Sequence, residues 1–98
     1  MTIEKTMTGA AATLKIVGRL DTTTAPELEA VIDGCAAEIK DLVLDCAALE
    51  YVSSAGLRVI LKAQKLMNAR GSMKLIHVRD EVKEIFEVTG FLDILTVE

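Results

Sequence analysis

The sequence predicts an α/β fold, and three observations favour that class. Short runs of β-forming apolar residues alternate along the chain with longer segments of helical periodicity. The length of 98 residues suits one domain with one modest core. No repeat, low-complexity stretch or linker interrupts the chain, so we expect one domain over 1–98. The expected order is ββαβαβαβ, with a mixed sheet that is mostly parallel after its first hairpin and helices packed against it.

The chain is expected to begin with a hairpin. Residues 2–8 and 12–18 alternate in polarity and are rich in Thr, Ile and Val. Gly9 and its neighbours are expected to form the turn between these strands, and a loop over 18–24 follows the second one.

The first helix is expected to begin near Thr24. Thr24-Ala25-Pro26-Glu27 fits a capping box, and proline is tolerated in a first turn. Apolar residues then recur at helical spacing, which predicts an amphipathic helix to about residue 39. These residues are Leu28, Val31, Ile32, Cys35 and Ile39.

Two further strand–helix pairs and a last strand complete the expected fold. The apolar run 41–45 between two acids suits a central strand covered on both faces. A mostly apolar helix follows Ser53-Ser54 and ends near 68–71, with Arg70 in the last turn and Gly71 beyond it. Residues 73–78 and 94–97 are expected to be strands.

A third helix is expected between these last two strands. Asp80 can cap it, and Val82, Ile85 and Phe86 follow at helical spacing. The helix is expected to stop at Thr89-Gly90.

Composition argues against several classes of partner. The net charge is −4 and no Lys/Arg cluster stands out, which disfavours binding to nucleic acid or anionic membranes. No apolar run reaches the roughly 18 residues needed to span a bilayer. The N-terminus lacks the apolar core of a signal peptide, so we expect a cytoplasmic protein. Cys35 and Cys46 lack CxxC spacing, which favours two reduced core thiols over a disulfide or metal pair.

Catalytic and cofactor sites have little support in the sequence. Ser53 or Ser54 could be a nucleophile with His77 as its base, but the G-x-S-x-G pattern of a nucleophile elbow is absent. His77 lies in an apolar run, where a structural histidine is the simpler interpretation. The chain has neither a phosphate-binding glycine loop nor a cluster of metal ligands at suitable spacing. We therefore expect no cofactor.

Asp21 and Asp45 both follow predicted strands. In an α/β sheet, ligands gather beyond the C-terminal ends of strands, so both acids are candidates for a binding site. The alternative is that each carboxylate ends its strand and accepts local N–H groups.

Ser53 and Ser54 mark the most informative position of the chain. They place hydroxyl groups at a helix N-terminus, where free N–H groups and the helix dipole favour negative charge. A phosphate attached there would be stabilised by the same forces, and Arg58 lies one helical turn further on. Two simpler alternatives remain open: one serine is only the N-cap, and Arg58 is a solvated surface residue.

Four segments together resemble a known family, the bacterial anti-sigma factor antagonists, which are single-domain members of the sulfate transporter and anti-sigma factor antagonist (STAS) family. The segments are Gly18-Arg19-Leu20-Asp21, 41–45, Tyr51-Val52-Ser53-Ser54-Ala55-Gly56-Leu57 and Val88-Thr89-Gly90-Phe91. The usual family motif is Asp-Ser-Ser/Thr-Gly. Aligned on Gly56, the phosphorylated serine corresponds to Ser54, Ser53 replaces the aspartate, and Ala55 replaces the second hydroxyl residue.

The resemblance implies a binding switch and not an enzyme. Such proteins bind, when unphosphorylated, an anti-sigma factor that is also an ATP-dependent serine kinase, and so free a sigma factor. Phosphorylation of one serine ends binding, and a metal-dependent serine phosphatase reverses it. Here the resemblance implies Ser54 as acceptor, with Ser53 as second choice. The expected partner-binding residues are Asp21, Ser53, Ser54, Gly56 and Arg58.

Two other functions are weighed against this switch. The first is a STAS adaptor that binds its partner without phosphorylation, for example beside a membrane transporter; the absence of the motif aspartate leaves room for it. The second is a sensor of a small molecule or nucleotide that uses the loops around Asp21 and Ser54. The aromatic content of 3% and the missing phosphate loop argue against the sensor.

Overall fold

The fold opens with the predicted hairpin. The computed structural model describes all of residues 1–98. In it, β1 (Thr2–Thr8) pairs antiparallel with β2 (Ala11–Leu20). Gly9 takes a φ of 60° in the turn between the strands, a left-handed conformation that glycine adopts without steric cost. The hairpin prediction is confirmed.

The rest of the sheet is parallel. β3 (Asp41–Asp45) pairs with β2, and β5 (Ser72–Ile76) pairs with β3, so the strand order is β1-β2-β3-β5. A fifth strand, β4 (Leu49–Val52), pairs with the C-terminal end of β2, beyond the point where β3 leaves it. The sequence predicts a loop at this position. With the additional strand, the observed order of strands and α-helices is ββαββαβα.

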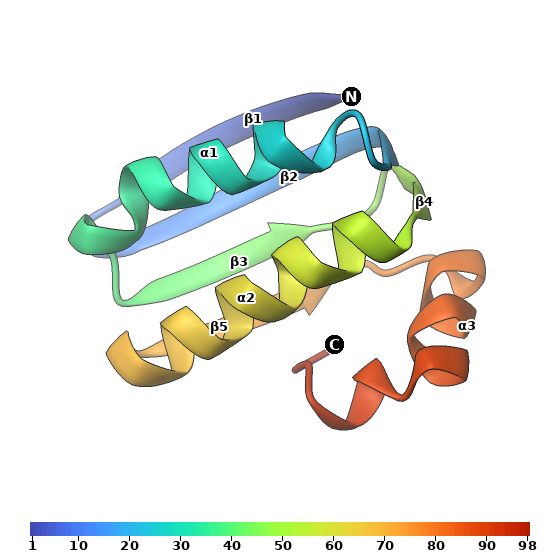
Figure 1. Cartoon of the computed structure of the whole chain (residues 1–98). Helices are drawn as coiled ribbons and strands as arrows, with labels where there is room; N and C mark the ends of the chain where they lie inside the picture. Colours follow the sequence, from blue (N-terminus) through green and yellow to red (C-terminus); the bar gives the residue numbers. More distant parts are fainter.

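Three α-helices follow their predicted positions closely. They are α1 (Ala25–Cys35), which continues as the 3₁₀ turn η1 (Ala36–Glu38), α2 (Ser54–Arg70) and α3 (Asp80–Thr89). A second 3₁₀ turn, η2 (Phe91–Asp93), follows α3. Helices α1 and α2 run side by side across one face of the sheet, while α3 lies at the end of the sheet against β4 (Figure 1).

The core lies between the sheet and these helices and is almost entirely aliphatic. The strands alternate in burial: Leu42 and Leu44 of β3 are buried, whereas Val43 between them is only half-buried. The expectation that this strand is covered on both faces is therefore wrong. The reason is that α1 and α2 cover the same face and leave the other face of the sheet without a helix (Figure 1).

The C-terminal third departs most from the prediction. The strand expected over 73–78 ends at Ile76, and the segment 94–97 forms a single bridge between Leu75 and Val97 in place of a strand. Asp80 does not cap α3, because Arg79 occupies the N-cap position and offers no side-chain hydrogen bond. Gly90, by contrast, ends α3 in the left-handed conformation at a φ of 78°, as a helix-stopping glycine should.

The two cysteines are buried and free, as expected for reduced core thiols. Burial raises the pKa of the Cys46 thiol to about 12, which keeps it protonated and unreactive at neutral pH. No helix of the protein combines the length and apolar character that crossing a bilayer requires.

Candidate functional site

Strand β4 brings the loop after β2 and the start of α2 together. It pairs with the end of β2, so that Val52 lies opposite Leu20. The next residue, Ser53, donates its backbone N–H to the carbonyl oxygen of Leu20 at 2.8 Å. Asp21 directly follows Leu20, so the loop after β2 and the start of α2 are held side by side at the C-terminal edge of the sheet.

The two serines have different roles at the start of α2. Ser53 is the N-cap: its backbone is extended and its Oγ accepts the N–H of Gly56 at 3.2 Å. Ser54 is the first helical residue, is exposed, and makes no side-chain hydrogen bond within the protein. The cap and the free hydroxyl are therefore two separate residues, an assignment that the sequence left open.

Gly56 lets α2 approach β2 closely. A Cβ atom at this position would lie 2.7 Å from Cγ of Leu20 and 3.0 Å from its carbonyl oxygen. Because both neighbours belong to the end of β2, this contact fixes the distance between Ser54 and the Asp21 loop. Gly56 itself is buried and shapes the site from beneath.

Asp21 organises the loop that precedes α1. Its Oδ1 accepts the backbone N–H groups of Thr23 at 3.0 Å and of Thr24 at 3.1 Å. These hydrogen bonds, that of Thr24 first, hold the pKa of Asp21 below its ordinary value. The predicted capping box is wrong, because the Thr24 hydroxyl donates to the Arg19 carbonyl and accepts the N–H of Asp21 in place of capping α1.

A shallow open groove of about 250 Å³ lies between the first turns of α1 and α2. Thr22 and Pro26 line one wall, and Ala55 and Arg58 line the other. The Arg58 side chain is exposed and has no ion pair within the protein. The groove thus reaches Ala55, the residue after Ser54, and contains the unpaired Arg58 together with Glu29, whose carboxylate is paired with Lys62.

The start of α2 is the only α-helix start in the fold without a carboxylate. Glu27 lies in the first turn of α1, and Asp80 and Glu81 lie in that of α3, whereas α2 has no acid in its first turn. The exposed N–H groups and the dipole at the start of α2 are therefore not balanced by any negative side chain of that turn.

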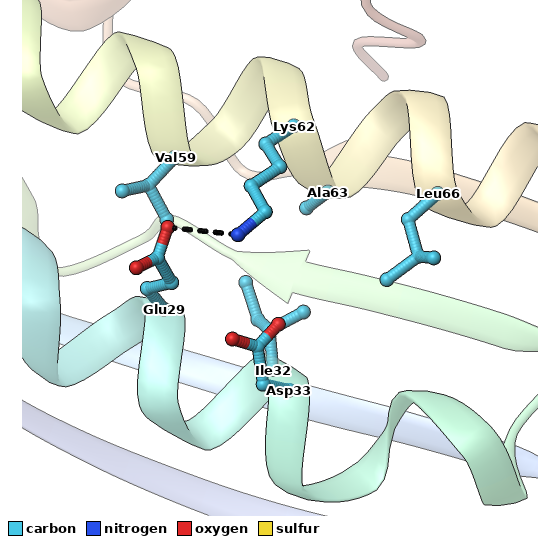
Figure 2. Close-up of a pocket in the computed structure, with 7 residues that line it drawn as sticks. All are labelled: Glu29, Ile32, Asp33, Val59, Lys62, Ala63 and Leu66. Carbon is cyan, nitrogen blue, oxygen red and sulfur yellow. Dashed lines mark hydrogen bonds and ion pairs between the residues drawn. The ribbon is translucent and has the colours of Figure 1, made fainter.

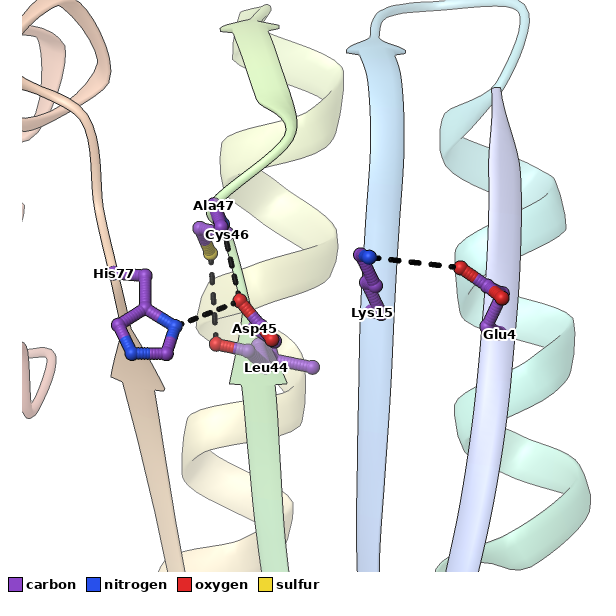
Figure 3. Close-up of polar contacts among 7 residues, drawn as sticks. All are labelled: Glu4, Lys15, Leu44, Asp45, Cys46, Ala47 and His77. Atoms are coloured by element: carbon purple, nitrogen blue, oxygen red, sulfur yellow. Dashed lines mark hydrogen bonds and ion pairs between the residues drawn. The ribbon is translucent and has the colours of Figure 1, made fainter.

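Asp45 forms a separate polar contact at the same edge of the sheet. Its Oδ1 lies 3.1 Å from Nδ1 of His77 and accepts the backbone N–H of Ala47, with 3.1 Å between nitrogen and oxygen. Figure 3 shows both partners beside this carboxylate. Partial burial acts to raise the pKa of Asp45, but these two partners hold it below its ordinary value. His77 is not a strand residue as expected: it follows β5 with a φ of 56° and is exposed. The contact fits a structural role that joins the loops after β3 and β5.

Sequence reasoning missed one contact near the site. Arg19 stacks over the ring of Tyr51, 4.3 Å from its centroid, across the β2–β4 pair. The β-forming dipeptide Tyr51-Val52 was the signal that β4 existed. No group of His, Cys, Asp or Glu side chains is arranged to hold a metal ion.

Comparison with known proteins places this geometry in a family context. A sequence model of the STAS domain matches residues 2–98. BtrV of Bordetella bronchiseptica, provisionally named an anti-sigma factor antagonist, is 39% identical over 85 residues, which cover 82% of this chain and 71% of BtrV. The anti-sigma-B factor antagonist of Staphylococcus aureus is 29% identical over 86 residues, covering 86% of this chain and 80% of that protein.

Solved structures of the anti-sigma factor antagonist SpoIIAA have the same fold. The unphosphorylated form matches with a TM-score of 0.84 at 17% identity, over 99% of this chain and 88% of SpoIIAA. The phosphorylated form, from Bacillus, matches with a TM-score of 0.78 at 16% identity, over 99% of this chain and 91% of that chain. At such identities the likeness establishes the fold.

Proposed function

The chain belongs to the STAS domain family, and we propose that it is a phosphorylation-switched anti-sigma factor antagonist. Unphosphorylated, it binds an anti-sigma factor that is also a serine kinase, and so frees a sigma factor. Phosphorylation of Ser54 ends that binding. The observation that carries the proposal is the exposed, unbonded hydroxyl of Ser54 at a helix start that has no acid of its own.

The geometry favours Ser54 over Ser53 as the phosphate acceptor. The Ser53 Oγ is engaged with the N–H of Gly56, so its modification would remove the helix cap. The Ser54 hydroxyl has no such role and lies on the exposed side of α2. A kinase can reach it without disturbing the fold.

A phosphate on Ser54 would release the partner through charge and bulk. It would bring roughly −1.5 to −2 charges to a helix end whose dipole stabilises negative charge, so the fold itself need not move. A partner surface pressed against Ser54 would have to desolvate this dianion or face it with its own acids, at a cost of several kcal/mol. Binding is thus lost while the folded state is kept.

The proposed binding surface surrounds Ser54. Asp21 shapes the neighbouring loop, Gly56 keeps α2 against β2, Ser53 fixes the first turn, and Arg58 extends from the groove wall. BtrV and the S. aureus protein are named as antagonists of this kind, and their resemblance to most of the chain supports the assignment.

The proposed protein is a binding regulator without catalytic activity of its own. The kinase partner supplies the phosphoryl chemistry, and a metal-dependent serine phosphatase resets the switch. Direct contact with nucleic acid or a membrane is not part of the proposal, because the net charge of −4 opposes both. The proposed exchange takes place in the bacterial cytoplasm, where sigma factors act.

The test is intact mass measurement after incubation with ATP and each anti-sigma-type kinase of the source organism, followed by site mapping. We expect one phosphate on Ser54, none on the Ser54→Ala variant, and a complex with the same kinase that survives in Ser54→Ala. A stable complex without phosphate under any condition would contradict the switch. It would favour the constitutive STAS adaptor, an alternative supported by Ser53 in place of the family aspartate.

A further inference from the structure

Helix α2 differs in charge from the rest of the protein. It has no acidic residue, and its basic residues are Arg58, Lys62, Lys65 and Arg70. The chain as a whole carries a net charge of −4, and the neighbouring helix α1 has no basic residue. The solvent side of α2 is therefore a positively charged strip on an acidic protein.

Two exposed basic residues of this strip lie on one line with the proposed phosphate site. Arg58 and Lys65 follow Ser54 by four and eleven positions, which return to the same face of an α-helix. At 1.5 Å per residue, Arg58 lies about 6 Å and Lys65 about 16 Å along the helix axis from Ser54. We call Ser54, Arg58 and Lys65 the α2 stripe.

The charges of the stripe are not neutralised within the protein. Lys62, beside the stripe, is paired with Glu29 of α1 at 3.2 Å across the seam between the two helices (Figure 2). Arg58 and Lys65 make no such ion pair. Two cations are thus available to a partner, whereas the third already has a carboxylate.

We infer that the α2 stripe docks on an acidic strip of the protein partner, whose carboxylates pair with Arg58 and Lys65. The inference rests on the proposed partner binding at Ser54 and names the chemistry of that partner's surface. Complementary charge speeds association and selects partners. Nucleic acid is the less favoured occupant, because the stripe offers only two unpaired cations, whereas nucleic-acid binding relies on many Lys and Arg contacts to phosphates.

The same arrangement explains how a single phosphate could act on a whole surface. On Ser54 it lies one helical turn from Arg58 and at the end of the stripe. There it repels the carboxylates of the partner and also competes with them for the Arg58 guanidinium. The switch would then depend on charge along the stripe and not only on bulk at Ser54.

The test is calorimetric affinity for the kinase that modifies Ser54, with the unphosphorylated protein and at two salt concentrations. Arg58→Glu and Lys65→Glu should each weaken binding about tenfold or more. The matched control is Lys83→Glu on α3, which changes the net charge equally at an exposed lysine away from the stripe and should change affinity by less than about threefold. The affinity of the unmodified protein should fall between about 50 and 300 mM salt. Equal effects of Lys65→Glu and Lys83→Glu would overturn the inference and leave the proposed function intact.

A second probe separates the failure of the two proposals. If no kinase binds, the proposed function fails, and NMR titration of the labelled protein with poly-glutamate at low salt still decides the inference. Amide shifts at Arg58 and Lys65 that disappear in Lys65→Glu would support an acidic partner surface. Absent shifts at the stripe, or equal shifts there with duplex DNA, would overturn it.

Discussion

Helices α2 and α3 begin in opposite ways. Helix α2 starts with a serine that caps it through a side-chain hydrogen bond and has no acid in its first turn. Helix α3 has no side-chain cap, but Asp80 and Glu81 lie in its first turn. At the start of α2, a neutral side-chain hydrogen bond satisfies one backbone N–H group. At the start of α3, two carboxylates balance the helix dipole.

This difference decides how each helix start in this chain would respond to added negative charge. The dipole at the start of α3 is already balanced by carboxylates, so further negative charge would be repelled there. At the start of α2 the cap satisfies one N–H without neutralising the dipole, and a phosphate would supply the missing charge. In this chain a phosphate on Ser54 would therefore be the first negative charge at the start of α2.

The largest expected effect comes from the third position of α2, occupied by Gly56, which corresponds to the buried Val82 in α3. Gly56→Val would force its side chain into Leu20 and should lower the free energy of unfolding by about 1–3 kcal/mol or more, as overpacking does. Urea unfolding measures this loss.

The matched control for that variant is Gly34→Ala in α1, where an added Cβ meets nothing within 4 Å. It should stabilise the protein by about 0.5–1 kcal/mol through helix propensity. If Gly56→Val were tolerated as well as Gly34→Ala, the close approach of α2 to β2 would not hold.

A smaller effect is expected from the caps themselves. Ser53→Ala removes the hydrogen bond to Gly56 and should lower the free energy of unfolding by about 1 kcal/mol. Arg79→Ala at the corresponding position of α3 removes no cap and should stay within about 0.5 kcal/mol. Thermal unfolding of both variants measures the two effects, and equal losses of stability would contradict the difference between the two helix starts.

Adding a charge at the start of α2 and removing one at the start of α3 should change the free energy of unfolding in opposite directions. Ser54→Asp adds an anion to α2 and should stabilise the fold by about 0.3–1 kcal/mol at low salt. Asp80→Asn removes one from α3 and should destabilise it by a similar amount. Both changes should shrink toward zero in about 1 M salt, where surface charges are screened. Urea midpoints at the two salt concentrations test this, and effects of equal sign would contradict the comparison.

The smallest expected effect concerns the loop beside α2 and depends on pH. The folded-state pKa of Asp21 is depressed, so its carboxylate stabilises the fold above its unfolded pKa of about 3.9. This contribution is lost as the pH falls through the lower, folded-state pKa. The Asp21→Asn variant should therefore have a lower free energy of unfolding than the unmodified protein at neutral pH. This difference, the stability gap, should become smaller as the pH falls into the acid range.

Asp33→Asn is the control for this pH dependence, because Asp33 is exposed and accepts no side-chain hydrogen bond in the structure. Unfolding measured across the acid range should show no comparable closing gap for this variant. A gap for Asp21→Asn that persists to low pH would mean that the hydrogen bonds of its loop do not depend on the charge.

The sequence predicted the parts of the fold that follow from periodicity. The hairpin, α1, α2 and the end of α3 at Gly90 have clear local patterns and lie where expected. Strand β4 was missed because its local signal is only the dipeptide Tyr51-Val52, and the four residues form a strand through pairing with the distant end of β2. The same strand brings Ser53 to Leu20, so the position of the site depends on the one strand that was not predicted.

Side-chain partners at the site were also beyond sequence reasoning. The capping-box pattern at Thr24 suggested a helix cap, but Asp21 and Arg19 compete for the same hydroxyl in the folded loop. His77 lies outside its predicted strand, because the chain turns there with a left-handed backbone, next to Asp45. The sequence identifies Ser53 and Ser54 as a pair. Only the folded structure shows that Ser53 is the cap and that Ser54 has the free hydroxyl.

The most direct test of the comparison is the NMR spectrum of the protein with phosphoserine placed at position 54 by genetic encoding, which needs no kinase. The account predicts amide shifts confined to the first turns of α2 and the neighbouring Asp21 loop, together with a higher unfolding midpoint at low salt. Shifts spread through all three helices, or a lower midpoint, would contradict the claim that the start of α2 accepts the phosphate without refolding.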